Sequence, residues 1–255
     1  MKKLTKLFAS AVLISTLVGC SSNTSSNEED TIYTIATDAK YAPFSMEVDG
    51  TYQGIDVEIL AAIAEKEGFK YELTPMDFSG IIPGLISGQL DGAIAGTTIT
   101  DERKKQVDFS DGYFESGLSL VTRSDSDITS VNDLQGKVAA VKKGTMGSIY
   151  AEDNAEQYGF TYEYYEDSPS MFLAVSNGTA DFLCEDYPVI LYSIATKTQE
   201  NLKIAVDRLL GTPVYGFSVK KGENAELLQM FNDGLEKIKS DGSYDEIIAK
   251  YLETE

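Results

Sequence analysis

The fold is decided by the stretch KVAAVKKGTMGSIYAEDNAEQYGFTYEYYEDSPSMFLAVSNGTADFLC, residues 137–184. Three short strand-like runs, at 137–141, 161–165 and 180–184, alternate with helical stretches at about 145–157 and 169–176. The second helical stretch stops at Asn177-Gly178, a typical helix end. Strands separated by helices form parallel sheets with right-handed crossovers. This stretch therefore predicts an α/β lobe.

The same alternation occurs earlier in the chain. Strands are expected at 32–36, 70–73 and 92–95, a hairpin at Asp49-Gly50, and helices that close at Gly68 and Gly88. Because the pattern starts twice, we expect two α/β lobes. Apolar runs at 118–122 and 214–219 are candidate crossovers between them, and two helices at 225–239 and 244–252 return to the first lobe. The expected lobes are 31–116 plus 217–255, and 117–216, with hinges near 113–120 and 212–218.

The first thirty residues are not expected to join the fold. Lys2, Lys3 and Lys6 precede an apolar core, residues 7–17, that is short for a membrane span. The core ends in Leu17-Val18-Gly19-Cys20, which looks like a lipobox. We expect a lipoprotein signal peptide at 1–20, acylation of Cys20, and a flexible tether at 21–30. The alternative is an ordinary secretory signal with a chance cysteine.

Composition excludes several classes of function. The formal net charge of −20 repels nucleic acid and anionic lipid headgroups, so attachment to a membrane would need the covalent lipid anchor. The chain has two cysteines and no histidine, which argues against a transition-metal site, and we expect no cofactor. With Cys20 acylated, Cys184 has no partner for an intramolecular disulfide and is expected to pack in the core.

Polar side chains follow the ends of the predicted strands, where open parallel sheets bind ligands. They offer anion acceptors, cation acceptors and neutral hydrogen bonds, the mixture that a zwitterion needs. The residues with polar side chains are Thr37, Asp38, Tyr41, Thr97, Thr98, Lys142, Thr145, Glu185 and Asp186, and Gly96, Gly144 and Met146 lie beside them in the same segments.

Each position also has an ordinary structural explanation. Asp38 and Asp186 could be turn or cap residues, and Thr145 could cap its helix. Tyr41 and Phe78 could be core aromatics. Arg103 could be a solvated residue paired with Asp101 or Glu102, although helix N-termini disfavour cations, so an arginine there suggests an anionic partner.

Residues 76–117, MDFSGIIPGLISGQLDGAIAGTTITDERKKQVDFSDGYFESG, resemble the polar amino-acid binding proteins of ABC importers, most closely the glutamine-binding branch. The resemblance spans essentially the whole mature chain. It continues through Thr37-Asp38, Ala42-Pro43-Phe44, Gly54-Ile55-Asp56-Val57, 136–142 and 242–247. It implies a type II periplasmic-binding-protein-like fold, with two lobes joined by two hinge strands that close on the ligand.

The resemblance also implies a role for each site residue. Arg103 would bind the ligand's α-carboxylate, completed by Thr98 and the backbone around Thr145-Met146. Asp186 would bind the α-ammonium with the carbonyl of Gly96. Tyr41 and Phe78 would flank the aliphatic part, while Asp38 and Lys142 would read the side chain.

A side-chain amide suits that last pair, because Lys142 can donate to its oxygen and Asp38 can accept from its nitrogen. A cationic side chain would face Lys142, and a glutamate would face Asp38. Glutamine is therefore favoured. The sequence departs from the glutamine branch at Glu185, where histidine is typical, and at Tyr41, where phenylalanine is common. Arginine, lysine, glutamate and histidine thus stay open.

We expect a binding protein and not an enzyme, although dehydratases share the fold and Glu185 or Asp38 could serve as a general acid. A sensor or adhesin role stays open. The expected partners are a small amino acid, an ABC permease and a membrane through the lipid anchor, for a monomer that binds no nucleic acid. The expected location is the outer face of the cytoplasmic membrane, the periplasmic side if there are two membranes.

Overall fold

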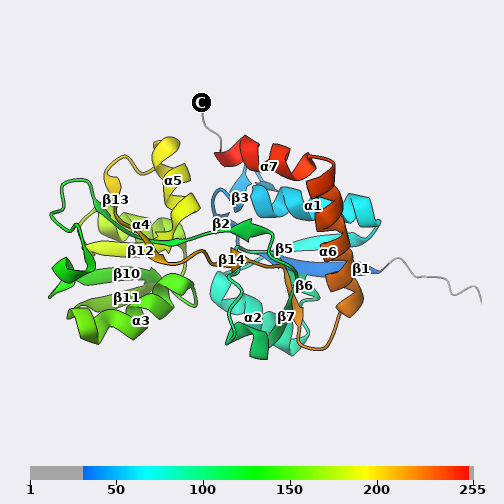
Figure 1. The fold of residues 1–255 in the computed structure, drawn as a ribbon, viewed down its shortest axis with the longest axis horizontal. Helices are drawn as coiled ribbons and strands as arrows, with labels where there is room; N and C mark the ends of the chain where they lie inside the picture. Colours follow the sequence, from blue (N-terminus) through cyan, green and yellow to red (C-terminus); the bar gives the residue numbers. More distant parts are fainter. Residues whose placement is uncertain (1–30, 253–255) are drawn as a thin grey trace, which may run out of the picture. The chain divides into compact units, whose positions relative to one another are not determined.

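The structure is a computed structural model that describes Thr31 to Leu252 (Figure 1). The signal peptide, the tether and the acylation of Cys20 that we expect from the sequence fall on residues outside this range. Within the described residues, no helix combines the length and apolar character needed to cross a membrane.

The first lobe is built on a five-stranded sheet in the order β5-β1-β6-β15-β7. β5, β1 and β6 are parallel, and β15 is antiparallel to β6 and β7. The lobe also holds a small antiparallel sheet, β2-β3-β4. Its elements are β1 (Ile32–Thr37), β2 (Lys40–Tyr41), β3 (Ser45–Val48), β4 (Thr51–Gln53), α1 (Ile55–Glu67), β5 (Lys70–Pro75), α2 (Phe78–Ser87), β6 (Gly92–Ala93), the 3-10 turn η1 (Arg103–Lys105), β7 (Val107–Phe109), β15 (Ser218–Lys220), α6 (Ala225–Ser240) and α7 (Ser243–Leu252).

Helices α1, α6 and α7 pack against one another on this lobe, as Figure 1 shows. Ile55, Ile59 and Ile63 are fully buried on α1, at the spacing of one helical face. The helix ends at Gly68, whose φ of 75° lies in the left-handed region that glycine adopts without steric cost. The C-terminal helices thus complete a lobe that the N-terminal residues begin.

The second lobe has a sheet in the order β11-β10-β12-β9-β13. β11, β10 and β12 are parallel, and β9 runs antiparallel to both β12 and β13. Its elements are β9 (Leu118–Arg123), the 3-10 turn η2 (Val131–Leu134), β10 (Val138–Lys142), α3 (Met146–Tyr158), β11 (Thr161–Tyr165), α4 (Ser168–Ser176), β12 (Phe182–Asp186), α5 (Tyr187–Ala195) and β13 (Leu202–Leu210).

The two lobes are joined by a pair of short antiparallel strands, β8 (Phe114–Glu115) and β14 (Val214–Tyr215). Both fall within the segments expected to form the hinge. The apolar run at 118–122 was a candidate crossover, and this interpretation is wrong: the run forms β9, inside the sheet of the second lobe. Leu118 to Thr122 are all buried, and such a run fits a strand covered on both faces and not an exposed connection.

Candidate functional site

A narrow pocket lies where strands of both lobes end. Its volume is about 10 Å³, and we call it the inner pocket. It is lined by Asp38, Tyr41, Phe78, Ala95, Gly96, Thr98, Arg103, Lys142, Thr145, Met146 and Asp186. The structure therefore brings together ten of the eleven site residues expected from the sequence, adds Ala95, and leaves Glu185 outside the lining.

Arg103 connects the two lobes at one end of the inner pocket. Its guanidinium donates to the carbonyl of Thr98 at 2.7 Å and to the carbonyl of Gly144, in the second lobe, at 2.9 Å. Only 6% of the residue is exposed, so Arg103 is not the solvated first-turn residue of the ordinary explanation; Glu102 pairs with Lys105 instead. Burial lowers the pKa of Arg103, while the charge of Asp186 acts to raise it.

The N-terminus of α3 lies at the same end. Thr145 is the N-cap: its hydroxyl accepts a hydrogen bond from the backbone N–H of Ser148 and donates to the carbonyl of Lys142 at 2.7 Å. The ordinary explanation for Thr145 as a cap is thus correct, and it is compatible with a ligand role. Free backbone N–H groups and the helix dipole make such a terminus suited to an anion. Together with Arg103, it gives this end of the pocket a preference for a carboxylate.

Asp186 is held by two phenols. Tyr41 and Tyr215 both donate to its Oδ2 atom, and their hydroxyl oxygens lie 2.9 Å apart. Burial raises the pKa of Asp186, against the lowering effect of the two phenols and of the charges of Arg103 and Lys142. A cation placed beside this carboxylate would favour its ionised form.

Tyr215 was not expected from the sequence as a site residue. It belongs to the hinge strand β14, is fully buried, and accepts a hydrogen bond from Ser116 at 2.8 Å. The one local signal for this residue is the apolar run at 214–219. That Tyr215 meets Asp186 depends on the tertiary arrangement of the hinge.

Asp38 and Lys142 form a buried ion pair across the two lobes. Their side chains are 4% and 2% exposed. Asp38 follows β1 in the first lobe, and Lys142 ends β10 in the second. The Lys142 ammonium also lies 4.9 Å from the ring centre of Tyr41 and 5.7 Å from that of Phe78. The pair thus presents one donor and one acceptor between two aromatic walls.

Glu185 lies buried beside the inner pocket, with 5% of its surface exposed. One oxygen accepts a hydrogen bond from the backbone N–H of Asp186 at 2.9 Å, while its Oε2 atom has no hydrogen-bond partner among the described residues. Burial and the neighbouring Asp186 raise the pKa of Glu185 to about 7, although the charge of Lys142 acts to lower it. Glu185 therefore changes its charge near neutral pH.

A second buried carboxylate, Asp56, supports the backbone of Gly96. It accepts hydrogen bonds from the Gly96 N–H and the Tyr113 hydroxyl, both at 2.8 Å. Burial raises its pKa to about 7 against the lowering effect of these two donors. Gly96 has φ = 57°, and a Cβ atom there would lie 2.5 Å from the Tyr41 ring, so only glycine fits. Asp56 thus fixes the loop that carries Gly96.

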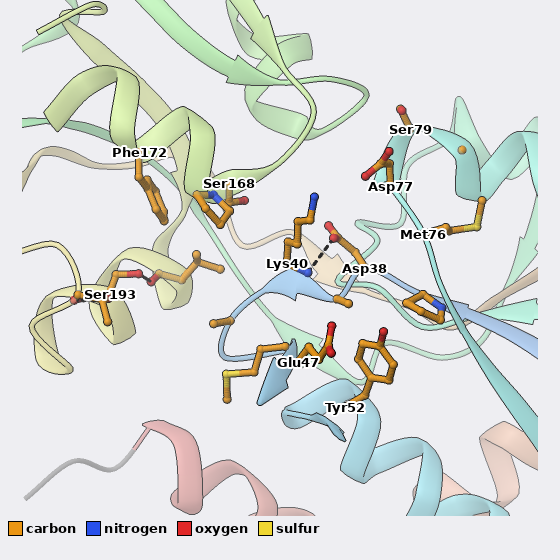
Figure 2. Close-up of a pocket in the computed structure, with 18 of the residues that line it drawn as sticks. Asp38, Lys40, Glu47, Tyr52, Met76, Asp77, Ser79, Ser168, Phe172 and Ser193 are labelled. Atoms are coloured by element: carbon orange, nitrogen blue, oxygen red, sulfur yellow. Dashed lines mark hydrogen bonds between the residues drawn. The ribbon is translucent and has the colours of Figure 1, made fainter. Parts of the chain in front are cut away.

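A larger cavity adjoins the inner pocket at Asp38. It has a volume of about 980 Å³, and we call it the outer cavity (Figure 2). The first lobe contributes Asp38, Lys40, Glu47, Tyr52, Met76, Asp77 and Ser79 to its lining, and the second contributes Ser168, Phe172 and Ser193, among others. Lys40 of β2 pairs with Asp167, the N-cap of α4, at 2.9 Å and links the two lobes at this cavity.

Residues 33–254 match the family described as bacterial extracellular solute-binding proteins, family 3. The chain belongs to this family. The family resemblance expected from the sequence is therefore confirmed. The two-lobed type II fold is confirmed as well, because solved amino-acid-binding proteins of that fold superimpose closely on the chain.

Three similar proteins illustrate the range of amino acids named for such relatives. The chain is 32% identical over 231 residues to a probable histidine-binding protein of Neisseria gonorrhoeae, covering 88% of this chain and 84% of that protein. It is 35% identical over 226 residues to the ABC transporter glutamine-binding protein GlnH of Bacillus subtilis, covering 87% and 80%. A solved ancestral arginine-binding protein is 38% identical, covers 87% of this chain, and has been solved with arginine and with glutamine. The TM-scores are 0.81 and 0.80, and the match covers 98% and 97% of those chains.

Proposed function

We propose that this chain is the ligand-capturing component of an ABC importer and that it binds a polar L-amino acid, with glutamine favoured. The observation that carries the proposal is the buried Asp38–Lys142 pair. It joins the two lobes and lines the same pocket as Arg103 and Asp186. Groups for the α-carboxylate, the α-ammonium and the side chain thus line one pocket. A ligand that contacts all of them stabilises the closed arrangement of the lobes.

The main-chain groups of an amino acid match two parts of the lining of the inner pocket, whose volume of about 10 Å³ requires the lobes to move apart before a ligand enters. Arg103 and the α3 N-terminus offer donors to the α-carboxylate, and in the bound state Arg103 would exchange a backbone carbonyl for this charged partner. Asp186 offers an acceptor to the α-ammonium, aided by the carbonyl of Gly96. The two tyrosines on Asp186 keep its orientation fixed.

The side-chain end favours a neutral amide. A primary amide inserted between Asp38 and Lys142 accepts from the ammonium and donates to the carboxylate, so both buried charges keep a partner. A glutamate side chain would place a second anion beside Asp38. The name of GlnH and the complex of the ancestral protein with glutamine are consistent with this preference.

Arginine is the second candidate, on the strength of Glu185. The unpaired Oε2 atom of Glu185 is buried next to Lys142. An ionised Glu185 would neutralise the charge of Lys142, so that Asp38 could pair with the guanidinium of the ligand. The ancestral relative, solved with arginine as well as glutamine, supports the idea that one scaffold accepts both side chains.

The remaining parts of the proposal concern location and partners. We propose that Cys20 is acylated and that the lipid holds a monomer on the outer face of the cytoplasmic membrane, where it meets its permease. The names of the relatives describe binding proteins, which supports a role in transport and not in catalysis.

Isothermal titration calorimetry tests this function. The purified chain would be unfolded and refolded to remove carried-over ligand, then titrated with each of the twenty amino acids. Tight binding of glutamine alone would support the amide assignment. Tight binding of arginine or lysine alone would replace it with the cationic alternative, and no binding of any amino acid would overturn the proposed function.

A further inference from the structure

The outer cavity begins where the proposed site for the ligand side chain ends. Asp38 belongs to the lining of both spaces, and its carboxylate faces Lys142 on one side and accepts from the backbone N–H of Lys40 on the other. Figure 2 shows Asp38 and Lys40 together in the outer cavity. Its volume of about 980 Å³ is at the upper end of the roughly 300–1,000 Å³ typical of small-molecule sites. The space is therefore large enough for part of a ligand.

The wall of the outer cavity contains a buried serine hydroxyl. Ser168 lines the outer cavity and is 2% exposed, and its hydroxyl has no hydrogen-bond partner among the described residues. The Ser168 hydroxyl lies close to the carboxylate of Glu185, which lines neither space, and it acts to lower the pKa of that carboxylate. Unpaired buried polar groups are uncommon, because each costs about 1–3 kcal/mol. A polar group of a ligand in the outer cavity could form a hydrogen bond with the Ser168 hydroxyl.

The outer cavity is negatively charged. Asp167, Asp77 and Asp38 all act to raise the pKa of Lys40. Lys40 is already paired with Asp167. Asp77 and Glu47 also line the cavity, and neither has a salt-bridge partner within residues 31–252. Two carboxylates are thus available to a cation, and an anion would be repelled.

We propose that the outer cavity is a second ligand subsite, and that it accepts a cationic substituent carried on the side-chain amide nitrogen of the bound amino acid. The chemical class is an N5-(aminoalkyl)-L-glutamine, the amide formed between the side-chain carboxyl of glutamate and one end of a diamine. This inference rests on the proposed function, since it uses the same inner pocket for the amino-acid part.

The chemistry of a secondary amide suits the border. It keeps its carbonyl oxygen as the acceptor for Lys142 and one N–H as the donor to Asp38. The alkyl substituent replaces only the second N–H and passes Asp38 into the outer cavity. Its terminal ammonium then lies among Asp77 and Glu47, while the Lys40–Asp167 pair lies beside it. Free glutamine uses the inner pocket alone.

The test is a titration of the purified full chain with four compounds: L-glutamine, N5-butyl-, N5-(4-aminobutyl)- and N5-(3-carboxypropyl)-L-glutamine. We expect the aminobutyl compound to bind at least as tightly as glutamine, and about tenfold more tightly than the carboxypropyl compound. Equal affinity for these two substituents, or no binding of any substituted glutamine, would overturn the inference and leave the proposed function intact. If glutamine itself fails to bind, the proposed function fails.

Two double variants, each of which removes two negative charges, test where the ammonium of the substituent binds. The double substitution Glu47→Gln and Asp77→Asn should weaken the binding of the aminobutyl compound about tenfold and leave the affinity for glutamine unchanged. The control is Asp49→Asn with Glu72→Gln, which removes the same charge from residues that line neither space. If both double variants weaken the aminobutyl compound equally, the effect is one of net charge, and the subsite is refuted.

Discussion

Substituting Asp56 by asparagine should stabilise the protein at alkaline pH and change the dependence of its stability on pH. Asp56 is fully buried and accepts from the Gly96 N–H and the Tyr113 hydroxyl. In the variant, the asparagine oxygen can keep the bond from Gly96, and its amide group can donate to the Tyr113 oxygen. The network therefore keeps its hydrogen bonds and loses only the ionisable group.

The magnitude follows from the pKa of Asp56, which burial raises from 3.8 to about 7. The folded state holds a proton that the unfolded chain has already released, so stability falls as the pH rises through the range between the two values. A difference of about 3 in pKa, at 1.36 kcal/mol for each unit, corresponds to about 4 kcal/mol. Of this, about 2–3 kcal/mol falls between pH 5 and pH 8.

Urea unfolding of ligand-free protein at pH 5 and pH 8 measures this effect. Glu185 and Asp186 also have raised pKa values and act in the same direction, but they are present in both proteins. The difference between wild type and the asparagine variant therefore isolates Asp56. As the pH rises from 5 to 8, we expect the free energy of unfolding of the wild type to fall by about 2–3 kcal/mol relative to that of the variant. Parallel pH profiles would refute the reasoning, because Asp56 would then be ionised in the folded protein at little cost.

Three further substitutions test the inner pocket by titration with amino acids. Arg103→Ala should abolish measurable binding, because the ligand carboxylate loses its bidentate partner in a buried site; micromolar affinity would contradict that role. Glu185→Gln should strengthen the binding of glutamine and weaken the binding of arginine about tenfold at pH 8. It should alter neither affinity at pH 5, where wild-type Glu185 is protonated because its pKa is about 7. An effect of equal size at both pH values would count against this role of Glu185. Tyr215→Phe should weaken binding about tenfold, since Asp186 loses one phenol donor while the ring stays packed; unchanged affinity would mean that Tyr41 alone holds Asp186.

Local patterns predicted most of the fold. Strands near 32–36, 137–141 and 161–165 and helices ending at Gly68 and Gly88 all appear in the structure, because apolar spacing and glycine ends are local signals. β13 was missed: Lys203, Asp207 and Arg208 interrupt its apolar run, and only its pairing with β9 makes it a strand. β6 is shorter than expected because the chain leaves the sheet toward Gly96, at the inner pocket.

The sequence predicted the site only as a set of polar groups after strands, together with a family resemblance. The residues that it did not predict are those whose role depends on distant partners. Asp56 lies in the first turn of α1, 40 residues before Gly96, and the Tyr215 hydroxyl reaches Asp186 across 29 residues. No periodicity encodes such a meeting. Arg103, by contrast, carries a local signal. A cation near the start of a helix is unfavourable enough to suggest a functional reason.

The position of β15 determines the order in which the lobes can be completed during synthesis. This strand lies between β6 and β7, although it comes about 110 residues after β7 along the chain. The second lobe, by contrast, is formed from one continuous segment, from β9 to β13. When the chain emerges with its N-terminus first, the later lobe therefore has all of its strands before the earlier one does. Until then β6 and β7 present open edges, so the earlier lobe is the part of the nascent chain that most needs protection from aggregation.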